Sequence, residues 1–185
     1  ATGTCPWRPA GIPFNGTSVL DSDQFILSPR LPRSLIVVGG GVIGLEYATI
    51  FSALDVAVTL IEPRERLLEF IDREIVDYLV HLMRDRGIAL RLGGEVASVQ
   101  FAADGSPVCL LADGRQVASD MVLFTSGRTG ATEELNLAAC GLTADKRGRL
   151  VVDPQTYQTN IPHIYSAGTV DQWPKNVTSI SGKLR

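Results

Sequence analysis

A short glycine-rich run is the feature of the sequence that most directly suggests chemistry. Gly39-Gly40-Gly41-Val42-Ile43-Gly44 satisfies the pattern G-x-G-x-x-G, directly after an apolar run and at the start of a helical pattern. In that setting Gly39 permits a tight turn, Gly41 leaves room for a pyrophosphate because it has no Cβ, and Gly44 lets the helix lie close to the strand. The free N–H groups of the helix N-terminus favour phosphate. The spacing therefore predicts a dinucleotide-binding turn, and the alternative is a glycine-rich turn that binds nothing.

Charged residues at the end of the next apolar run bear on which dinucleotide would bind. Glu62 closes that run, at about the distance from the glycines where an acidic residue accepts hydrogen bonds from the adenine ribose. Such a carboxylate repels a 2′-phosphate and favours NAD, although it could also be a solvated strand-end group. Arg64 and Arg66 follow it, and a guanidinium suits a 2′-phosphate. The pattern favours NAD and leaves NADP open.

Other polar residues near the predicted site have equally simple structural explanations. Glu46 is expected on the first turn of the helix, where a carboxylate suits the helix dipole with or without a ligand. Gly127 and Arg128 follow a later apolar run, at the sheet edge where open α/β sheets bind ligands, but Arg128 could equally form a surface ion pair. No Ser–His–Asp or Cys–His arrangement is readable in the sequence. We therefore predict no catalytic side chain and expect a cofactor to do the chemistry.

Composition and charge argue against several kinds of function. The 185 residues carry a net charge of −3, whereas a nucleic-acid-binding protein needs a basic face. No apolar run approaches the length of a membrane span. Cys5, Cys109 and Cys140 lack the CxxC spacing, and His81 and His163 have no partner at ligand spacing, so we predict no metal site. Reduced thiols and a cytoplasmic location are expected.

The elements that must position these residues alternate between strand and helix. The apolar run 35–38 predicts a strand buried on both faces, and residues 42–51 and 56–61 continue it as a strand–helix–strand unit. Asp72 can cap a further helix that Gly87 ends. The residues expected on its buried face are Ile75, Leu79, Leu82 and Met83.

The remainder of the chain changes its hydrophobic period. Residues 88–92 predict a third strand and residues 121–125 another buried strand, and the alternation over 95–116 predicts a small antiparallel meander between them. Residues 148–152 and 164–167 are expected to form short strands. The predicted fold class is α/β, a Rossmann-like NAD(P)-binding domain with a central parallel sheet and an antiparallel β-meander.

Four stretches together resemble the FAD-dependent pyridine nucleotide-disulfide oxidoreductases, the flavoproteins with two dinucleotide-binding motifs. They are residues 1–4, 36–48, 126–130 and 164–168, in the order and spacing of that family. Within the family the resemblance is greatest to the soluble transhydrogenases, on residues 62–75 and on Gly127-Arg128-Thr129-Gly130, where lipoamide dehydrogenases usually carry Gly-Arg-x-Pro.

The resemblance implies a flavoprotein oxidoreductase that passes hydride between NADPH and NAD through FAD. The complete protein would be a cytoplasmic homodimer, and this chain alone an incomplete, inactive monomer. Glu46 would lie near the flavin, and Thr2 and Gly3 would contact FAD, whereas Thr169 replaces the family's ribityl-binding aspartate. The residues implied at the NAD(P)H site are Gly39, Gly41, Val42, Ile43, Gly44, Glu62, Arg64, Val96 and Gly127.

Two other functions remain open at this point. One is a disulfide reductase resembling dihydrolipoamide dehydrogenase, which would need a redox cysteine pair before residue 1. The other is a stand-alone NAD(P)-binding module without turnover. For the domain organisation we expect an NAD(P)-binding domain over residues 34–153, a connecting segment from the FAD domain over 1–33, and a segment returning toward it over 154–185.

Overall fold

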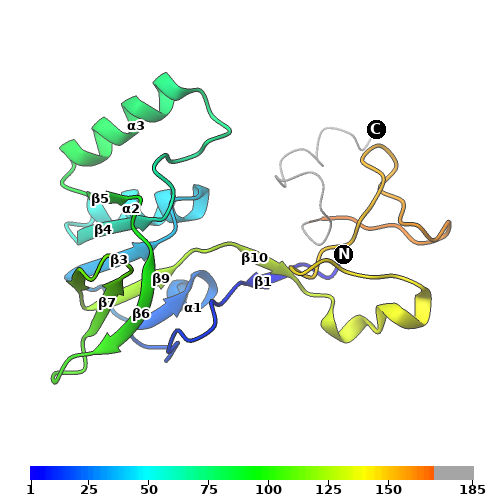
Figure 1. Cartoon of the computed structure of the whole chain (residues 1–185), viewed down its shortest axis with the longest axis horizontal. Coiled ribbons are helices and arrows are strands. Elements are labelled where there is room, and N and C mark those ends of the chain that lie inside the picture. Colours follow the sequence, from blue (N-terminus) through cyan, green and yellow to red (C-terminus); the bar gives the residue numbers. More distant parts are fainter. Residues whose placement is uncertain (169–185) are drawn as a thin grey trace. The chain divides into compact units, whose positions relative to one another are not determined.

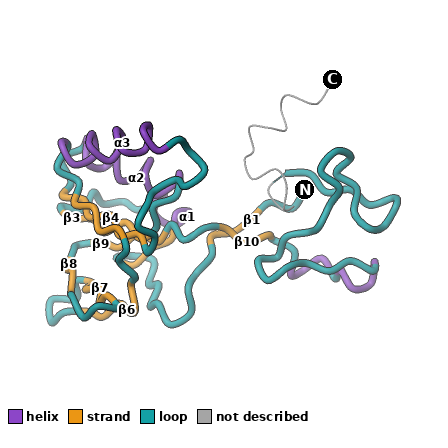
Figure 2. The backbone as a smooth tube through the Cα atoms, turned by 45° about the horizontal axis from the view of Figure 1, so that its top comes forward, coloured by secondary structure: helices purple, strands orange, loops and turns teal. Residues whose placement is uncertain are grey.

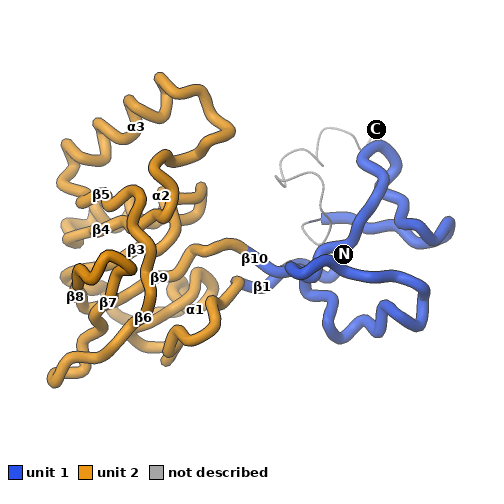
Figure 3. The backbone as a smooth tube through the Cα atoms, viewed as in Figure 1, with its two compact units in different colours: residues 1–6, 128–185 blue, residues 7–127 orange. Residues whose placement is uncertain are grey.

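The chain forms two compact units in a computed structural model that describes residues 1–168. The larger unit is Trp7–Gly127, and the smaller one combines Ala1–Pro6 with the residues from Arg128 onward (Figure 3). The chain therefore passes through the smaller unit, builds the larger one as an insertion, and returns.

A five-stranded sheet forms the centre of the larger unit (Figure 1). All its neighbouring strands are parallel. In spatial order the strands are β2 (Val19–Asp21), β9 (Met121–Phe124), β3 (Ser34–Val38), β4 (Ala57–Glu62) and β5 (Ala89–Leu92). The apolar side chains of β3, β4 and β9 are mostly buried on both faces, which explains why these strands appear in the sequence as continuous apolar runs, whereas the edge strand β5 is only partly buried. This arrangement confirms the predicted α/β class.

Helices cover one face of this sheet. They are α1 (Ser22–Ile26), α2 (Val42–Ala53) and α3 (Arg73–Asp85). Leu35 and Val37 of β3 point toward this side, where they form one apolar cluster with residues of α2 and α3 such as Leu45 and Met83. Figure 2 shows α2 and α3 above the strands in that view.

The predicted antiparallel meander is present, and it covers the opposite face of the sheet. Its strands are β6 (Val96–Phe101), β7 (Pro107–Leu111) and β8 (Gln116–Ala118). Ile36 and Val38 alternate with the helix-facing residues of β3 and form a second cluster with Val99 and Cys109 of the meander. The unit therefore has three layers, and the carboxyl ends of the central strands β3, β4 and β9 meet at one edge of the sheet between them.

The segment before residue 34 does more than connect, and the larger unit differs from the predicted range 34–153 at both ends. Val19–Asp21 adds β2 to the edge of the sheet. Asp21 also caps α1, and its carboxylate forms an ion pair with the Arg8 guanidinium at 2.6 Å. A strand of three residues is too short to show a period of two. Its burial depends on β9, which lies about a hundred residues away in the chain, so no local pattern could indicate it.

Helix α3 has the predicted ends but a different buried face. The Asp72 carboxylate accepts a hydrogen bond from the Glu74 N–H at 3.0 Å, and Gly87 follows the helix with φ +79°. Val76 and Met83 are buried, whereas Ile75 is 63% exposed and Leu82 40% exposed. The prediction that Ile75 and Leu82 face the core is therefore wrong, because the apolar face of the helix is wide and the sheet contacts only the side of it that carries Val76 and Met83.

The smaller unit is held by a two-stranded ribbon and is otherwise irregular. β1 (Thr4–Pro6) pairs antiparallel with β10 (Arg128–Gly130), and the 3-10 turns η1 (Glu133–Leu135) and η2 (Leu137–Cys140) follow. The strands predicted over 148–152 and 164–167 are wrong: these segments make only isolated bridges. The Asp145 and Asp153 carboxylates accept hydrogen bonds from N–H groups two to four residues later, which favours turns over extended chain.

Candidate nucleotide-binding site

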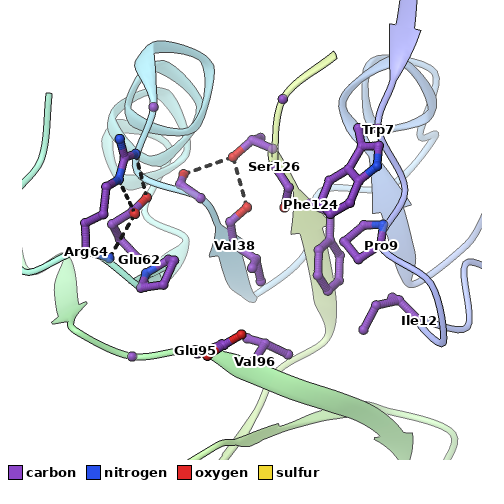
Figure 4. Close-up of a pocket in the computed structure, with 16 residues that line it drawn as sticks. Trp7, Pro9, Ile12, Val38, Glu62, Arg64, Glu95, Val96, Phe124 and Ser126 are labelled. Atoms are coloured by element: carbon purple, nitrogen blue, oxygen red, sulfur yellow. Dashed lines mark hydrogen bonds and ion pairs between the residues drawn. The ribbon is translucent and has the colours of Figure 1, made fainter. Parts of the chain in front are cut away.

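A pocket of about 520 Å³ opens in the larger unit at the carboxyl edge of the sheet (Figure 4). Its volume is in the usual range for small-molecule sites, and its position, where β3, β4 and β9 end, is where open α/β sheets bind ligands. The lining residues are Trp7, Pro9, Ile12, Val38, Gly39, Gly41, Glu62, Pro63, Arg64, Gly94, Glu95, Val96, Phe124, Thr125, Ser126 and Gly127.

Two glycines of the turn between β3 and α2 are required by the fold itself. Gly39 has φ +114°, and a Cβ on it would lie 2.7 Å from the Thr125 carbonyl oxygen. A Cβ on Gly44 would collide with the Gly39 carbonyl oxygen. The Thr125 hydroxyl donates to that same oxygen at 2.9 Å. These contacts hold α2 against β3 and β9 and fix the direction of the helix N-terminus.

Gly41 is different, because neither strain nor packing explains it. Its φ is −75°, which any residue adopts, and a Cβ there would meet nothing within 4 Å. It is the N-cap residue of α2, and no side chain caps this helix. The open space over Gly41, beside the N–H groups of the helix N-terminus, matches what a pyrophosphate requires.

Glu62, at the end of β4, is buried against this turn. Its side chain is only 3% exposed, and its Oε2 accepts a 2.5 Å hydrogen bond from the Gly40 N–H. A Cβ on Gly40 would run into Glu62 and the Leu67 side chain, so glycine at position 40 makes room for the carboxylate. The acidic residue predicted to read a ribose therefore lies directly beside the glycine turn.

Arg64 folds back onto this carboxylate. Its Nε donates to Oε1 of Glu62 at 2.7 Å and its Nη2 to Oε2 at 3.2 Å, and its own backbone N–H donates to Oε1 at 3.1 Å. Burial raises the pKa of Glu62, but the hydrogen bonds from the Arg64 side chain and from the Gly40 and Arg64 N–H groups outweigh it, so the pKa lies below its ordinary value. The pair is therefore ionised at neutral pH.

The other wall of the pocket is apolar and includes residues that no sequence pattern indicated. Trp7, Pro9 and Ile12 come from the segment predicted to be a connection, and Phe124 ends β9. The Trp7 N–H donates to the Gly127 carbonyl oxygen at 2.9 Å, which brings this segment to the sheet edge. Thr125 and Ser126 directly follow β9, so the rule that ligands bind at strand carboxyl ends could have identified them.

The structure brings together part of the predicted set. Of the predicted nucleotide-site residues, those that line the pocket are Gly39, Gly41, Glu62, Arg64, Val96 and Gly127. Gly44 supports the turn from behind, and Val42 and Ile43 do not line the pocket. Glu46 is exposed and lies beyond the first turn of α2, contrary to the prediction, because the helix begins only at Val42.

The remaining predicted residues lie elsewhere. Thr2 and Gly3 are exposed residues of the smaller unit, and Thr169 lies outside the described residues. Arg128 has a structural contact: its Nε donates to the Thr4 hydroxyl at 2.6 Å and its Nη2 to the Thr4 carbonyl oxygen at 2.7 Å, which ties β10 to β1.

Within residues 1–168, no three His, Cys, Asp or Glu side chains are placed to hold a metal ion. No helix in that part of the chain has the length and apolar character needed to cross a membrane.

Comparison with known proteins identifies the family. The family model described as pyridine nucleotide-disulphide oxidoreductase matches residues 1–181. The chain belongs to this family. Pyridine nucleotide-disulphide oxidoreductases use FAD and NAD(P)H. The resemblance predicted from the sequence is thereby confirmed.

Relatives within the family carry a consistent name. The soluble pyridine nucleotide transhydrogenase of Mycobacterium tuberculosis is 43% identical over 174 residues, which cover 94% of this chain and 37% of the relative. That of Aliivibrio fischeri is 44% identical, with 94% and 36% covered. The chain therefore spans little more than a third of the length of these relatives.

Solved structures of the family have the same fold. The HOCl-induced flavoprotein disulfide reductase RclA from Escherichia coli matches with a TM-score of 0.85 at 29% identity, over 96% of this chain and 40% of that one. LpdA from Mycobacterium tuberculosis matches with a TM-score of 0.87 at 28% identity, over 96% and 38%.

Proposed function

We propose that the larger unit binds NAD(H) or NADP(H), and that the complete protein is a soluble pyridine nucleotide transhydrogenase that moves hydride between NADPH and NAD through FAD. The observation that carries the binding proposal is Gly41. Its backbone conformation and surroundings do not require glycine, yet it leaves open the space beside an uncapped helix N-terminus. The transhydrogenase proposal is supported by relatives of that name at 43–44% identity.

In this proposal, different residues of the pocket bind different parts of the nucleotide. The N–H groups at the start of α2, beside Gly39 and Gly41, take the pyrophosphate. Glu62 accepts from the hydroxyls of the adenine ribose, and Val96 and Gly127 bound the pocket on its other sides. Hydride transfer needs no side-chain acid or base, in keeping with a site whose charged groups are engaged in binding.

FAD supplies the two-electron relay in the complete protein. Thr2, Gly3 and Thr169 are its proposed contacts in this chain. In the smaller unit Gly3 and Gly168 have φ of +75° and +94°, and a Cβ on either would meet nothing within 4 Å. Open backbone of this kind suits the close approach of a cofactor. We assign residues 7–127 to the nucleotide, place the smaller unit with the FAD domain, and propose a cytoplasmic homodimer for the complete protein.

A disulfide reductase is the second candidate, because RclA is a flavoprotein disulfide reductase with a TM-score of 0.85 to this chain. The cysteines in the described part of the chain give it no support. Cys5 and Cys140 are unpaired and exposed, and burial raises the pKa of Cys109 to about 12, so that it stays a thiol. A reductase would need its redox cysteines elsewhere in the protein.

Titration with NADH and NADPH tests the binding proposal, with nicotinamide fluorescence as the readout. We expect saturable binding by the chain and its loss in Gly41→Ala, because the added methyl group occupies the space for the pyrophosphate. Ile50→Ala, at an exposed position on the same helix, is the matched control and should bind normally. Unchanged affinity in Gly41→Ala would contradict the site assignment.

A further inference from the structure

We propose that Arg64 makes one ribose site serve both nucleotides: it leaves Glu62 when NAD(H) binds and holds the 2′-phosphate when NADP(H) binds. This inference rests on the proposed function, because it concerns how the same pocket distinguishes its two ligands. It follows from the way the Glu62 carboxylate is occupied, which is seen at the left of Figure 4.

The hydrogen-bonding capacity of Glu62 is fully used in this structure. A carboxylate offers about four acceptor positions. Those of Glu62 receive the Gly40 N–H, the Arg64 N–H, and the Nε and Nη2 of the Arg64 guanidinium. A ribose diol therefore finds no free acceptor on Glu62 until one of these donors leaves.

Only the guanidinium can leave without disturbing the fold. The Gly40 and Arg64 N–H groups belong to the backbone, on either side of the glycine turn and the end of β4. The Arg64 side chain, by contrast, is 47% exposed and lies in the wall of the pocket, whereas Glu62 is 3% exposed. The Arg64 guanidinium can therefore move into solvent, whereas the Glu62 carboxylate is not accessible to water.

The exchange with NAD(H) is balanced in hydrogen bonds. A buried carboxylate that loses its donors is strongly destabilised. The 2′- and 3′-hydroxyls of a ribose supply two donors, the same number that Nε and Nη2 withdraw. Displacement of a half-exposed guanidinium adds a modest cost to NAD(H) binding, so Arg64 competes with this ligand.

When NADP(H) binds, by contrast, the Arg64 guanidinium stays on Glu62. A 2′-phosphate removes one of the two hydroxyl donors and places negative charge near a carboxylate whose pKa is already depressed. A guanidinium has five N–H groups, and only two of those of Arg64, on Nε and Nη2, are directed at Glu62. The others can hold the phosphate in a fork, so that Arg64 stands between the two negative groups.

Arg64→Met tests this, because it keeps the aliphatic stem and removes the guanidinium. We expect NADPH to bind about tenfold to a hundredfold more weakly, as for the loss of charge-assisted hydrogen bonds, and NADH to bind about two- to fivefold more tightly, as for the loss of a half-exposed ion pair. Competition by ADP-ribose and 2′-phospho-ADP-ribose, which lack nicotinamide, should show the same opposite changes. Arg64→Lys should retain part of the NADPH affinity.

Two further variants complete the experiment. Arg66→Met is the matched control, two residues further on and outside the pocket lining, and it should change neither affinity. Glu62→Gln should weaken NADH binding and leave NADPH binding equal or tighter, because it frees the guanidinium. Thermal melting of each variant separates these effects from unfolding.

The outcomes are distinguishable from failure of the proposed function. If the unchanged chain binds neither nucleotide, both proposals fail. If it binds both and Arg64→Met weakens both equally, Arg64 only positions Glu62 and the exchange is disproved. If Arg66→Met instead weakens NADPH, the reader of the 2′-phosphate is Arg66 and the inference is wrong.

Discussion

Glu62 shows, at the scale of a single residue, how a ligand-reading group is held ready by its neighbours. Its carboxylate is removed from water at the end of a central strand, and its negative charge is retained because a backbone N–H of the glycine turn and an arginine donate to it. The same contacts link the glycine turn, β4 and the segment after it. We therefore expect Glu62 to contribute to stability as well as to binding.

The stability contribution of Glu62 should depend on pH in one direction. Its folded-state pKa is lowered from 4.5, so its stabilising interactions are fully present above that value and are lost as the pH falls through the lower folded value. Glu62→Gln should therefore reduce the melting temperature most at pH 7, and the difference from the unchanged chain should shrink as the pH falls below 4.5 toward the lower folded-state pKa. Melting curves across this pH range measure it. A difference that stays constant would show that the charge of Glu62 does not stabilise the fold.

At the scale of elements, the glycines of the strand–turn–helix unit have two different roles. Gly39 and Gly44 are required by the fold, whereas Gly41 leaves space for a ligand. Gly44→Ala places a methyl group against the Gly39 carbonyl oxygen, and we expect a loss of about 1–3 kcal/mol in the free energy of unfolding. Gly41→Ala adds a methyl group to open space at an unstrained φ, so it should change that free energy by less than about 1 kcal/mol. Urea denaturation of the two variants compares them directly. Equal losses would mean that Gly41 too is a packing residue.

The same unit shows what can be predicted from sequence. Strands β3 and β4 are buried on both faces and the glycine turn has a fixed spacing, so the sheet edge, Gly41 and Glu62 were predictable from local patterns. Strand β2 was not, because its three residues are defined by pairing with a distant strand. The Arg64 contact was also missed: Arg64 was assigned only to a 2′-phosphate, since sequence gives residue order but not the direction of a side chain.

Other misses have related physical causes. Trp7 and Ile12 reach the pocket because a backbone hydrogen bond from Trp7 to Gly127 brings an aperiodic segment to the sheet edge. The buried face of α3 differs from the predicted one because Ile75 and Val76 both belong to one wide apolar face, and only the tertiary contact decides which part of that face is buried. In each case the deciding neighbour is remote in sequence.

For the whole molecule, the division into units predicts which part of the chain is sufficient for the site. Every residue that lines the pocket lies between Trp7 and Gly127, and these two residues are joined by a 2.9 Å hydrogen bond where the chain enters and leaves the larger unit. Adjacent ends of this kind are common in domains inserted into another domain. Both apolar clusters are also built entirely from residues of this unit.

We therefore expect a chain of residues 7–127 to fold and to bind NADH within about tenfold of the affinity of the 185-residue chain, a difference of about 1.4 kcal/mol. Removal of residues 1–6 and 128–185 takes away no pocket-lining side chain and no member of either apolar cluster. Circular dichroism and the fluorescence titration, applied to both chains in parallel, measure folding and affinity. A fragment that folds but does not bind would place part of the nucleotide site in the smaller unit. A fragment that does not fold would show that the larger unit depends on residues 1–6 or 128–185 for its stability.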